Sequence, residues 1–578
     1  MSKELNNMKI YKSIIAALLV GSVLTGGLTS CSDSWLDVES KTESNTGNFY
    51  RTQDDAESAL IGCYSAWRRT NSYGTWGFYM CSTLMSDECF AGTGVADTPD
   101  YSVVDRFDQS RYAAGTSLLE SAWDSYYKCI YRCNELIRYD ENGQIEWNDG
   151  AVRGRIMGEC HALRALCYFD MVRLWENIPL LTEPTDNPNV PQANPDDVYA
   201  TIVSDFKFAA DNIPSDAYPR SEKDINDGRL TRFAAEGMLA RVYLYYNGYY
   251  GKQLANLSKE EVVNYLDEII KSGDYKLEQF SHLWPAASQT PAKDSHSWEK
   301  DNYKMVNDEV ILQMHFNYIG NAYGSDEDKH GNRWIVMFGL RKFWASPYGY
   351  GWGCGTVNPR LASAFSRNDL RYKASIIDFL GEDLPSKMSN GSTGTFDDYL
   401  RDQREYTGYA VKKFTPTCYF DGETTIPGKT GTIVQEYQTQ PYVILRYADV
   451  LLMAAELGGT PSKTAQECFD EVHRRAFTDE DGNLNDGYAQ LTVTNETILR
   501  ERQCEFAFEA IRYWDLLRQG VDYAANTIAE NELQVLTGNQ PDFITIKAEN
   551  IRNKRGLMQI PQNQITLSNG VLHQNQGW

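Results

Sequence analysis

The sequence predicts a mainly α-helical fold, a tetratricopeptide-like superhelix of helix pairs that is interrupted by a loop-rich insertion containing short strands. Apolar residues recur at three- and four-residue steps over most of the 578-residue chain. The helical stretches follow one another in pairs, and each is too narrow to bury its apolar stripe without a neighbour. Between residues 280 and 440 the helical period mostly disappears, and Gly, Ser, Asn, Asp and aromatic residues become frequent.

The first expected helix, 52–68, starts at a capping residue, Thr52, and places Ala56, Leu60 and Cys63 at helical spacing. The same kind of spacing predicts further helices in both halves of the chain. Their ranges are 117–138, 154–175, 196–213, 231–247, 259–272, 442–457, 463–477 and 495–518. Because the intervals vary and a long segment intervenes, the repeats are degenerate.

The insertion is expected to carry function, since loop-rich segments of this length inside a compact helical protein usually do. Strand-like pieces lie at 309–316 and 432–437, and a cluster of turn-forming residues occupies 386–397. These features predict four regions: a signal peptide, an N-terminal helical region, the insertion and a C-terminal helical region. Their ranges are 1–30, 31–275, 276–440 and 441–578.

The first thirty residues have the features of a bacterial lipoprotein signal peptide. Three lysines precede a short apolar core at 14–24, and residues 28–31 (Leu-Thr-Ser-Cys) form a lipobox. Cleavage before Cys31 and acylation of that residue would anchor the mature chain, because each buried methylene contributes roughly 0.8 kcal/mol. A plain cleaved signal peptide is the alternative. No later stretch has the roughly twenty apolar residues of a membrane-spanning helix.

The charge of the chain argues against nucleic acid as a partner. Asp and Glu number 79 against 55 Lys and Arg, which gives a formal net charge of −24. Such an excess repels phosphate backbones and anionic membrane surfaces. With 42% hydrophobic residues, the chain has ample material for a large core.

Eleven cysteines follow Cys31, and we predict that they are small buried hydrophobic residues rather than a disulfide framework. Cys129 and Cys133 are four residues apart, and Cys160 and Cys167 seven, so each pair lies on one helix face. The sequence lacks the C-x-x-C and H-E-x-x-H patterns typical of zinc sites. Neither a metal site nor a cofactor is therefore expected.

An acidic turn near the C-terminal helices leaves a cation site as the less favoured alternative. Asp479, Asp481 and Asn483 have the spacing of calcium ligands, yet Leu484 stands where an EF-hand loop needs glycine. We favour a solvated turn.

Four segments carry motifs that are more specific together than any one of them alone. Residues 162–170 read ALRALCYFD, 445–456 read LRYADVLLMAAE, and 501–518 read ERQCEFAFEAIRYWDLLR. The chain ends in QIPQNQI at 559–565 and QNQGW at 574–578. In these motifs and in their order, the sequence resembles the SusD/RagB family of outer-membrane nutrient-binding lipoproteins of Bacteroidetes. It departs from the family's closing signature where Gln564 replaces an acidic residue, Gln576 a proline and Trp578 a tyrosine.

The resemblance implies a surface-exposed lipoprotein that binds oligosaccharide or polysaccharide and delivers it to a SusC-like TonB-dependent transporter of the outer membrane. The helical scaffold would face the transporter, and the loop-rich side would bind the glycan without covalent chemistry. The protein is therefore expected to be a binding protein, not an enzyme. Asp33, Asp37 and Glu39, just after the lipobox, resemble the surface-export signal of this phylum and indicate an outward-facing protein.

Two other functions stay open. The ligand could be a peptide or a host glycoprotein glycan in the same transport role, or the chain could be a lipid-anchored glycoside hydrolase. A hydrolase would need two carboxylates that flank the scissile bond, and Glu501, Glu505 and Glu509 are spaced along one expected helix face. Carboxylates on successive turns of one helix cannot readily do so. We therefore expect a structural ion-pair network, with arginines at 446, 502, 512 and 518 available as partners.

The density of aromatic residues in the insertion marks the candidate ligand residues. Residues 334–352 hold seven aromatic residues in nineteen positions, whereas the whole chain is 12% aromatic. Aromatic faces cover the flat C–H faces of pyranose rings, and polar side chains bind the hydroxyls. The resemblance implies that ligand sites are built from loops here and after the first helix; core packing is the alternative for each ring. The candidates are Trp334, Trp344, Trp352, Trp298, Tyr348, Tyr350, Trp284, Trp76 and Asp87.

Overall fold

The computed structural model describes most of the chain from Phe49 to the C-terminus. The described ranges are 49–72, 77–98, 100–111, 119–187, 189–223, 228–288, 304–317, 331–341, 347–382, 396–418 and 438–578. From Thr52 onward these residues belong to one folded unit, and the fold below is that of this unit. The signal peptide and Cys31 lie outside the described residues, so their predicted roles stay predictions.

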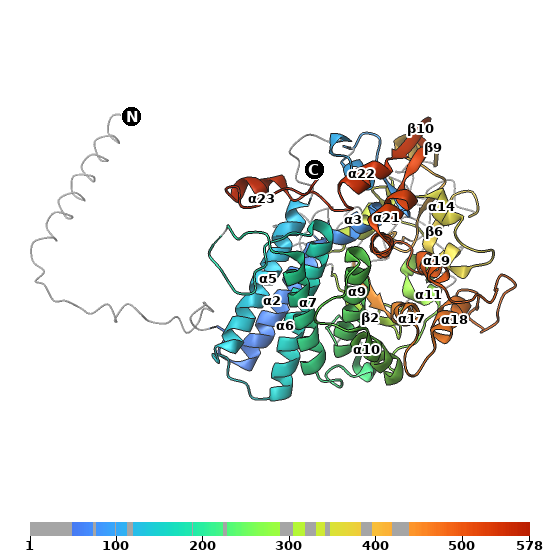
Figure 1. Cartoon of the computed structure of the whole chain (residues 1–578). Coiled ribbons are helices and arrows are strands. Elements are labelled where there is room, and N and C mark those ends of the chain that lie inside the picture. Colours follow the sequence, from blue (N-terminus) through green and yellow to red (C-terminus); the bar gives the residue numbers. More distant parts are fainter. Residues whose placement is uncertain are drawn as a thin grey trace, which may run out of the picture. The chain divides into compact units, whose positions relative to one another are not determined.

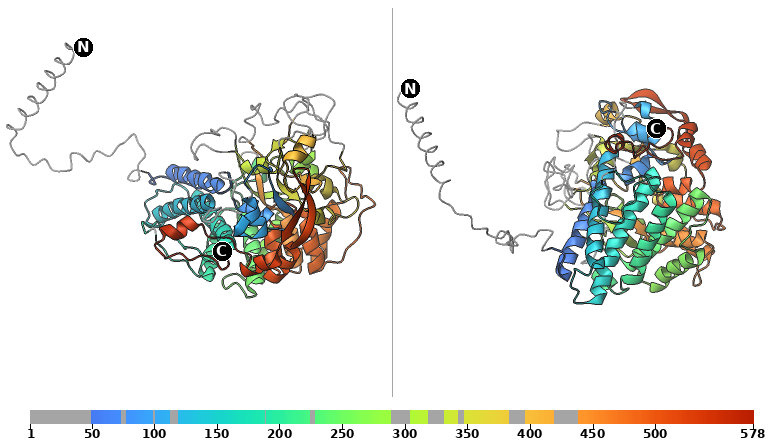
Figure 2. Two further views of the ribbon diagram at one scale, coloured as in Figure 1. Left: turned by 90° about the horizontal axis from the view of Figure 1, so that it is seen from above. Right: turned by 60° about the vertical axis from the view of Figure 1, so that its left-hand side comes forward.

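Six long helices lie side by side and form the scaffold (Figures 1 and 2). They are α2 (Gln53–Ser72), α5 (Glu120–Glu141), α6 (Gly150–Trp175), α7 (Pro195–Asn212), α9 (Arg232–Tyr250) and α10 (Lys259–Ser272). Helix α2 packs on α5, α5 on α6, α6 on α7, α7 on α9, and α9 on α10. Their bounds lie within four residues of the predicted ones. The mainly helical fold of packed helix pairs is confirmed.

Capping side chains decide where these helices begin. The Asn194 side chain accepts the backbone N–H of Asp196, and Pro195 occupies the first turn, where a missing N–H leaves no bond unmade. Ser258 and Glu261 form a capping box at the start of α10. Such contacts satisfy donors that the first turn of a helix otherwise leaves without a partner.

The C-terminal helical region differs from the prediction at its start. Residues 442–446 form strand β8 (Tyr442–Arg446), and only then does helix α17 (Tyr447–Glu456) begin. Strand β8 pairs in antiparallel fashion with β2 (Val310–Met314), the strand predicted at 309–316. The prediction of a helix from 442 was wrong because a short run of buried apolar residues fits either structure, and periodicity does not separate the two.

The single helix predicted over 495–518 is in fact two helices. Helix α19 (Asn495–Glu505) ends before Phe506, and α20 (Arg512–Leu517) follows after a turn. Between them Phe508 and Ala510 have φ angles of 65° and 58°, a left-handed conformation that a right-handed helix cannot contain. The helix predicted at 463–477 is α18 (Ala465–Arg475).

The insertion contributes most of the small sheets. One sheet is antiparallel, with the strand order β1 (Cys89–Gly92), β5 (Cys354–Val357), β7 (Tyr409–Val411), β6 (Ile376–Asp378). Strands β3 (Leu340–Arg341) and β4 (Tyr350–Gly351) pair in parallel, and β9 (Glu530–Thr537) forms a hairpin with β10 (Gln540–Ile546). Because β1 precedes α5 in the chain, the sheet joins the insertion to the N-terminal helical region.

Short helices complete the described structure. They are α3 (Phe78–Leu84), α4 (Tyr101–Arg106), α11 (Phe280–Leu283), α12 (Pro285–Ser288), α13 (Arg333–Phe338), α14 (Pro359–Ala362), α15 (Leu370–Ser375), α16 (Phe396–Asp402), α21 (Val521–Ile528), α22 (Ala548–Asn553) and α23 (Gln562–Leu567), with 3-10 turns at Gln109–Arg111 and Arg220–Glu222. In the described part of the chain, no helix combines the length and the apolar character needed to cross a bilayer. The predicted strand 432–437 and positions 386–395 of the turn cluster lie outside the described residues.

All eleven cysteines after Cys31 are buried, and none of them forms a disulfide bond, as predicted. Cys63 on α2, Cys133 on α5 and Cys160 on α6 come together, and their Sγ atoms lie within 4.8 Å of one another. The thiol of Cys160 donates to the backbone carbonyl of Cys133 at 3.5 Å. These contacts place the thiols in the packing between the helices.

A buried network of ion pairs confirms the structural role predicted for the glutamates. Glu501 and Glu505 lie on α19, whereas Glu509 follows its end, so the three do not share one helix face. The Arg446 guanidinium binds Glu509 through Nε at 2.9 Å and also contacts Glu505. Other members of the network, which the sequence did not indicate, include Glu309, Asp369, Arg371, Lys413, His473 and Arg475.

The other arginines of the C-terminal motif form ion pairs elsewhere in the core. Arg502 binds Asp449 at 2.6 Å and Asp515 at 2.7 Å, and Arg518 binds Asp515 at 2.9 Å. These pairs hold α17, α19 and α20 together. The motif at 501–518 therefore has a structural role in the scaffold.

Candidate functional site

An open cavity of about 430 Å³ lies where the N-terminal region meets the insertion. It is lined by Thr93, Asp97, Thr98, Asp100, Tyr101, Arg341, Trp352 and Cys354. These residues are brought together by strand pairing: Gly92 on β1 lies opposite Cys354 on β5, and Arg341 on β3 lies opposite Gly351 on β4. We call this cavity the Trp352 cavity.

Glycines beside Trp352 let the backbone cross at close range and so fix the position of the ring. A Cβ atom on Gly351 would lie 2.3 Å from the Cα of Gly339, a distance that no side chain tolerates. The next residue, Trp352, donates its backbone N–H to the carbonyl of Val336 at 2.9 Å. The glycine-rich run after 348, which fits no nucleotide-binding pattern, thus serves to pack β3 against β4.

The Arg341 side chain forms the charged wall of the Trp352 cavity. Its Nη2 donates to Asp97 Oδ1 and its Nε to Asp402 Oδ2, both at 3.0 Å, and only 9% of the residue is exposed. A guanidinium bound by two carboxylates is held in one orientation. The Asp97 side chain keeps 40% exposure, and its two oxygens offer more acceptor sites than Arg341 uses.

The loop that carries Asp97 is held in place by Arg404. The Arg404 Nη2 donates to the carbonyls of Val95 at 3.0 Å and Asp97 at 2.9 Å. The Gly94 N–H donates to Asp97 Oδ2 at 2.9 Å. These bonds restrain the loop before any ligand arrives, and such restraint lowers the entropic cost of binding.

The aromatic part of the cavity consists of Trp352 and Tyr101. The Trp352 side chain is half-buried, and the Arg333 guanidinium lies over its ring at 5.1 Å from the centroid. Burial raises the pKa of the nearby Asp100 carboxyl above its usual range, although hydrogen bonds partly oppose this shift. An indole ring beside a guanidinium, carboxylates and threonine hydroxyls can cover a sugar face and bind its hydroxyls.

Of the predicted ligand residues, Trp352 alone among those described lines this cavity. Tyr350 is half-buried on β4, two residues earlier. Trp284 and Trp334 lie in the core, where they are 1% and 5% exposed. The Trp334 ring packs against Phe414 at a centroid distance of 4.2 Å. Neither core tryptophan offers a free face to a ligand in this structure.

Two further predicted ligand residues also lie in the scaffold. Tyr348 is 2% exposed, and its hydroxyl donates to Glu382. Asp87 is 7% exposed and accepts two bonds from Arg512, at 2.8 and 2.9 Å. Trp76, Trp298 and Trp344 lie outside the described residues. The candidate site therefore depends on Trp352 together with residues that the sequence did not single out.

Arg341, Asp97 and Asp100 were missed because they are ordinary polar residues in sequence, and some 240 positions separate the two acids from the arginine. The signal that points to them is indirect. It lies in the aromatic and glycine-rich run that ends at Gly355, since this run positions the strands that bring the polar residues together.

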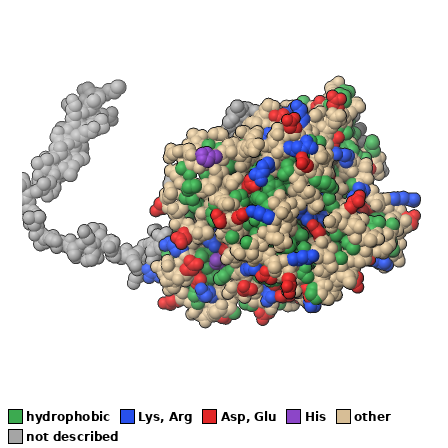
Figure 3. All heavy atoms as spheres, viewed as in Figure 1, with side chains coloured by type: hydrophobic (Ala, Val, Ile, Leu, Met, Phe, Trp, Pro, Cys, Tyr) green, Lys and Arg blue, Asp and Glu red, His purple; other side chains and the backbone are tan. Residues whose placement is uncertain are grey.

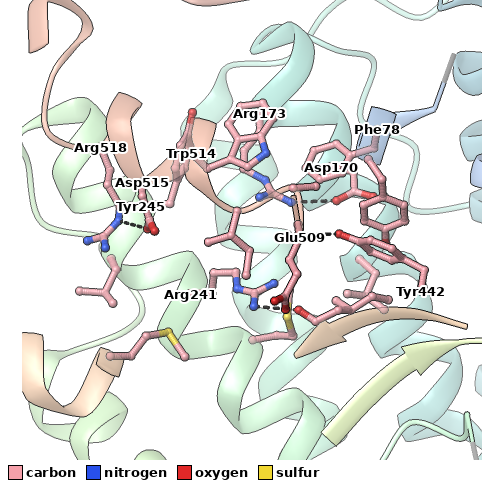
Figure 4. A pocket seen from close by; sticks show the side chains of 18 of the residues that line it. Phe78, Asp170, Arg173, Arg241, Tyr245, Tyr442, Glu509, Trp514, Asp515 and Arg518 are labelled. Atoms are coloured by element: carbon pink, nitrogen blue, oxygen red, sulfur yellow. Dashed lines mark hydrogen bonds and ion pairs between the residues drawn. The ribbon is translucent and has the colours of Figure 1, made fainter. Parts of the chain in front are cut away.

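A second cavity lies inside the core and is shown in Figure 4. Phe78, Tyr245, Tyr442 and Trp514 line it together with charged residues. Its volume of about 40 Å³ holds a few water molecules and no sugar ring. Asp170 is bound there by Arg173 at 2.8 Å. This cavity is part of the scaffold.

Two groups have the composition of a metal site. The thiols of Cys63, Cys133 and Cys160 are close enough to share one ion, but they are fully buried among apolar side chains. The turn at Asp479 uses its carboxylate on its own backbone, since Oδ1 accepts the N–H groups of Asp481 at 3.0 Å and Asn483 at 2.8 Å. These bonds agree with the solvated turn that we favoured.

Glu88, next to the predicted ligand residue Asp87, gives stability an expected pH dependence. Burial, and then the charge of Asp87, raises the pKa of Glu88 to about 8. The folded protein therefore binds this proton more tightly than the unfolded chain, so this contribution to stability falls as pH rises from about 5 to 8. We expect a loss of about 2 kcal/mol between pH 6 and pH 8 from this group.

Urea unfolding of the Glu88→Gln variant at both pH values measures this effect. Between pH 6 and pH 8, the free energy of unfolding should fall less in Glu88→Gln than in the native protein. Glu141→Gln, a control at an exposed position, should show the same fall as the native protein. Equal losses in the native protein and in Glu88→Gln would show that the prediction is wrong.

Comparison with known proteins shows to which family the chain belongs. A family model described as SusD family matches residues 308–578, and one described as starch-binding associating with outer membrane matches residues 34–244. The chain belongs to the SusD/RagB family. SusD-like protein P2 of Formosa agariphila is 22% identical over 99% of this chain and 100% of its own length. A SusD-like protein of Bacteroides ovatus is 27% identical over 42% of this chain and 41% of its own.

Solved structures share the fold of this SusD/RagB-family protein. Surface glycan-binding protein A from Bacteroides fluxus has a TM-score of 0.69 and 24% identity, and the match covers 91% of this chain and 99% of that one. A laminarin-binding SusD-like protein has a TM-score of 0.67 and 24% identity, with 92% and 100% covered. Surface glycan-binding protein A from Bacteroides thetaiotaomicron, in complex with laminarihexaose, has a TM-score of 0.68 and 20% identity, with 91% and 99% covered.

Proposed function

We propose that the protein binds an oligosaccharide or polysaccharide in the Trp352 cavity and delivers it to a SusC-like TonB-dependent transporter. The observation that carries the proposal is a half-buried indole beside an arginine that two carboxylates hold in place. Relatives whose names state glycan binding, among them the laminarin-binding protein and the laminarihexaose complex, support this ligand class.

The proposed ligand is uncharged overall. On the face shown in Figure 3, acidic and basic side chains are interspersed, and neither sign forms a large patch. In the cavity Asp97 and Asp402 together offset the Arg341 charge, through contacts at 2.9 and 3.0 Å. A neutral polyhydroxylated chain gains hydrogen bonds there without an ionic partner.

The proposed place of action is the outer membrane, with Cys31 as the lipid-bearing residue and the body facing outward. The family description that names association with the outer membrane supports this location. A tethered binding protein searches for its ligand in the membrane plane, and this raises the effective concentration of glycan near the transporter. The proposed role is binding without covalent chemistry.

Affinity electrophoresis tests the function directly. The purified mature protein is run through gels that contain laminarin, soluble starch or a host glycoprotein glycan, and peptide binding is measured by calorimetry. Retardation by one polysaccharide is the expected result. Binding to peptides alone would contradict the proposal. Release of shortened sugars on incubation with the bound glycan would make the protein a hydrolase.

A further inference from the structure

We propose that a groove along α5 is a second oligosaccharide-binding site, an inference that rests on the proposed function. The groove has a volume of about 710 Å³ and lies between α5, the segment after α6 and the C-terminal helix α23. A volume in this range suits a small-molecule ligand. Its lining includes Trp123, Tyr127 and Tyr131 from α5, and Leu567 and Leu572 from the tail. We call it the α5 groove.

The three rings of the α5 groove form a ladder. Trp123, Tyr127 and Tyr131 follow one another at four-residue steps, so they lie on one face of the helix, about 6 Å apart along its axis. Exposure rises along the ladder, from 4% at Trp123 through a half-buried Tyr127 to 52% at Tyr131. The first two rings are in contact, with centroids 5.2 Å apart. Trp123, which also packs on Trp175, therefore closes the floor of the groove, and Tyr127 and Tyr131 are the rings that a ligand can reach.

A row of polar side chains accompanies the rings. Asp124, Lys128 and Arg132 each follow one ring by a single position and form a neighbouring row on the helix. All three line the groove, and they supply both acceptors and donors. Aromatic faces next to one acceptor and two donors fit a chain of sugar rings, which presents flat apolar faces edged by hydroxyls.

The second wall carries a residue in which this chain departs from the family signature. Gln564 on α23 donates its side-chain amide to Asp124 Oδ1 at 3.1 Å. Burial raises the pKa of the Asp124 carboxyl, so a second carboxylate at 564 would add repulsion. The amide instead fixes the Asp124 carboxylate, whose other oxygen stays available as an acceptor. The Tyr127 hydroxyl is likewise fixed, because it donates to the carbonyl of Pro179 at 2.8 Å.

The α5 groove is distinct from the Trp352 cavity, because the two share no lining residue among the described positions. It is built from scaffold helices, whereas the Trp352 cavity is built from loops and strands. Two sites on one body can bind separate stretches of a polysaccharide, and this raises the overall affinity for long chains above that for short ones.

Isothermal calorimetry and affinity electrophoresis with laminarihexaose, laminarin and soluble starch test the proposal. Five proteins are compared: the native mature chain, Tyr131→Ala, Trp352→Ala, the variant with both substitutions, and a control. Tyr523→Ala is the matched control, because this tyrosine is 44% exposed and lies on α21, away from both sites. Tyr131 is exposed, so its replacement should leave the melting temperature unchanged.

We expect Tyr131→Ala to weaken polysaccharide binding about fivefold or more, whereas Tyr523→Ala leaves it unchanged. Trp352→Ala should retain weak binding that the double variant loses. Unchanged binding in Tyr131→Ala, together with loss in Trp352→Ala, would overturn the α5 groove and leave the proposed function standing. Binding that depends on Tyr131 alone would uphold the groove and overturn the Trp352 cavity. Binding of peptides alone to the groove, or no glycan binding by the native chain, would overturn the proposal.

Discussion

Replacing Arg446 with methionine is expected to lower the free energy of unfolding by about 4 kcal/mol. The Arg446 side chain is 1% exposed, and its partners Glu309, Glu505 and Glu509 are at most 2% exposed. Removing this cation would leave the three buried carboxylates close together with only Lys413, Arg475 and Arg371 to compensate their charge. Methionine is apolar and similar in length, so the loss of stability comes chiefly from the buried negative charge that is left, rather than from an empty volume.

The charges of this network depend on one another. Burial alone would raise the pKa of Glu505, but Arg475, Arg446 and Arg371 lower it to about 2. Because the folded-state pKa lies below the unfolded one, this carboxylate stabilises the protein above about pH 5, and its contribution is lost as pH falls toward 2. In Arg446→Met the pKa of Glu505 should be lowered less. The difference in free energy of unfolding between the native protein and Arg446→Met should therefore become smaller as the pH falls from 7 to 4.

Urea unfolding followed by circular dichroism at pH 7 measures the effect. Arg367→Met is the control, because this arginine is 84% exposed and its ion pair with Asp486 spans 3.8 Å. The control should change stability by less than about 0.5 kcal/mol. A loss of less than about 1 kcal/mol in Arg446→Met would contradict a stabilising role for the network.

The long helices could be predicted because their apolar spacing and capping residues are local. Ser258 and Glu261 predict the start of α10 without reference to the rest of the fold. The break after α19 could not be predicted, because nothing in the sequence requires Phe508 and Ala510 to adopt positive φ angles. Tertiary contacts decide this turn, which places Glu509 against Arg446 and Lys413.

The sequence indicated only part of the candidate site, because the contacts that form it join residues far apart in the chain. Aromatic density drew attention to the segment that contains Trp352, but composition does not separate a core ring such as Trp334 from a cavity ring such as Trp352. The difference is set by neighbours: Phe414 and Tyr442 enclose Trp334, whereas Trp352 lies at a strand junction beside Arg341. The pairing of β1 with β5 that creates the junction joins residues more than 250 positions apart.

Replacing Trp352 with alanine is expected to weaken oligosaccharide binding in the Trp352 cavity about 30-fold or more, which corresponds to about 2 kcal/mol. The Trp352 ring is half-buried and lines the cavity. Its removal takes away the aromatic face on which a sugar ring would stack. Removing Arg341 as well should abolish binding in this cavity, because the Asp97 and Asp402 carboxylates would lose the cation that they share and would repel each other.

Calorimetry with laminarihexaose or another oligosaccharide that binds the native protein measures the change. Trp147→Ala is the matched control: Trp147 is also half-buried, its Nε1 donates to Asp140 at 2.9 Å, and it lines neither cavity. Because both variants remove an indole of similar burial, any common loss of stability appears in the control, and the difference between them isolates ligand contact. Equal affinities of the two variants would assign Trp352 to packing and remove the observation on which the proposed function depends.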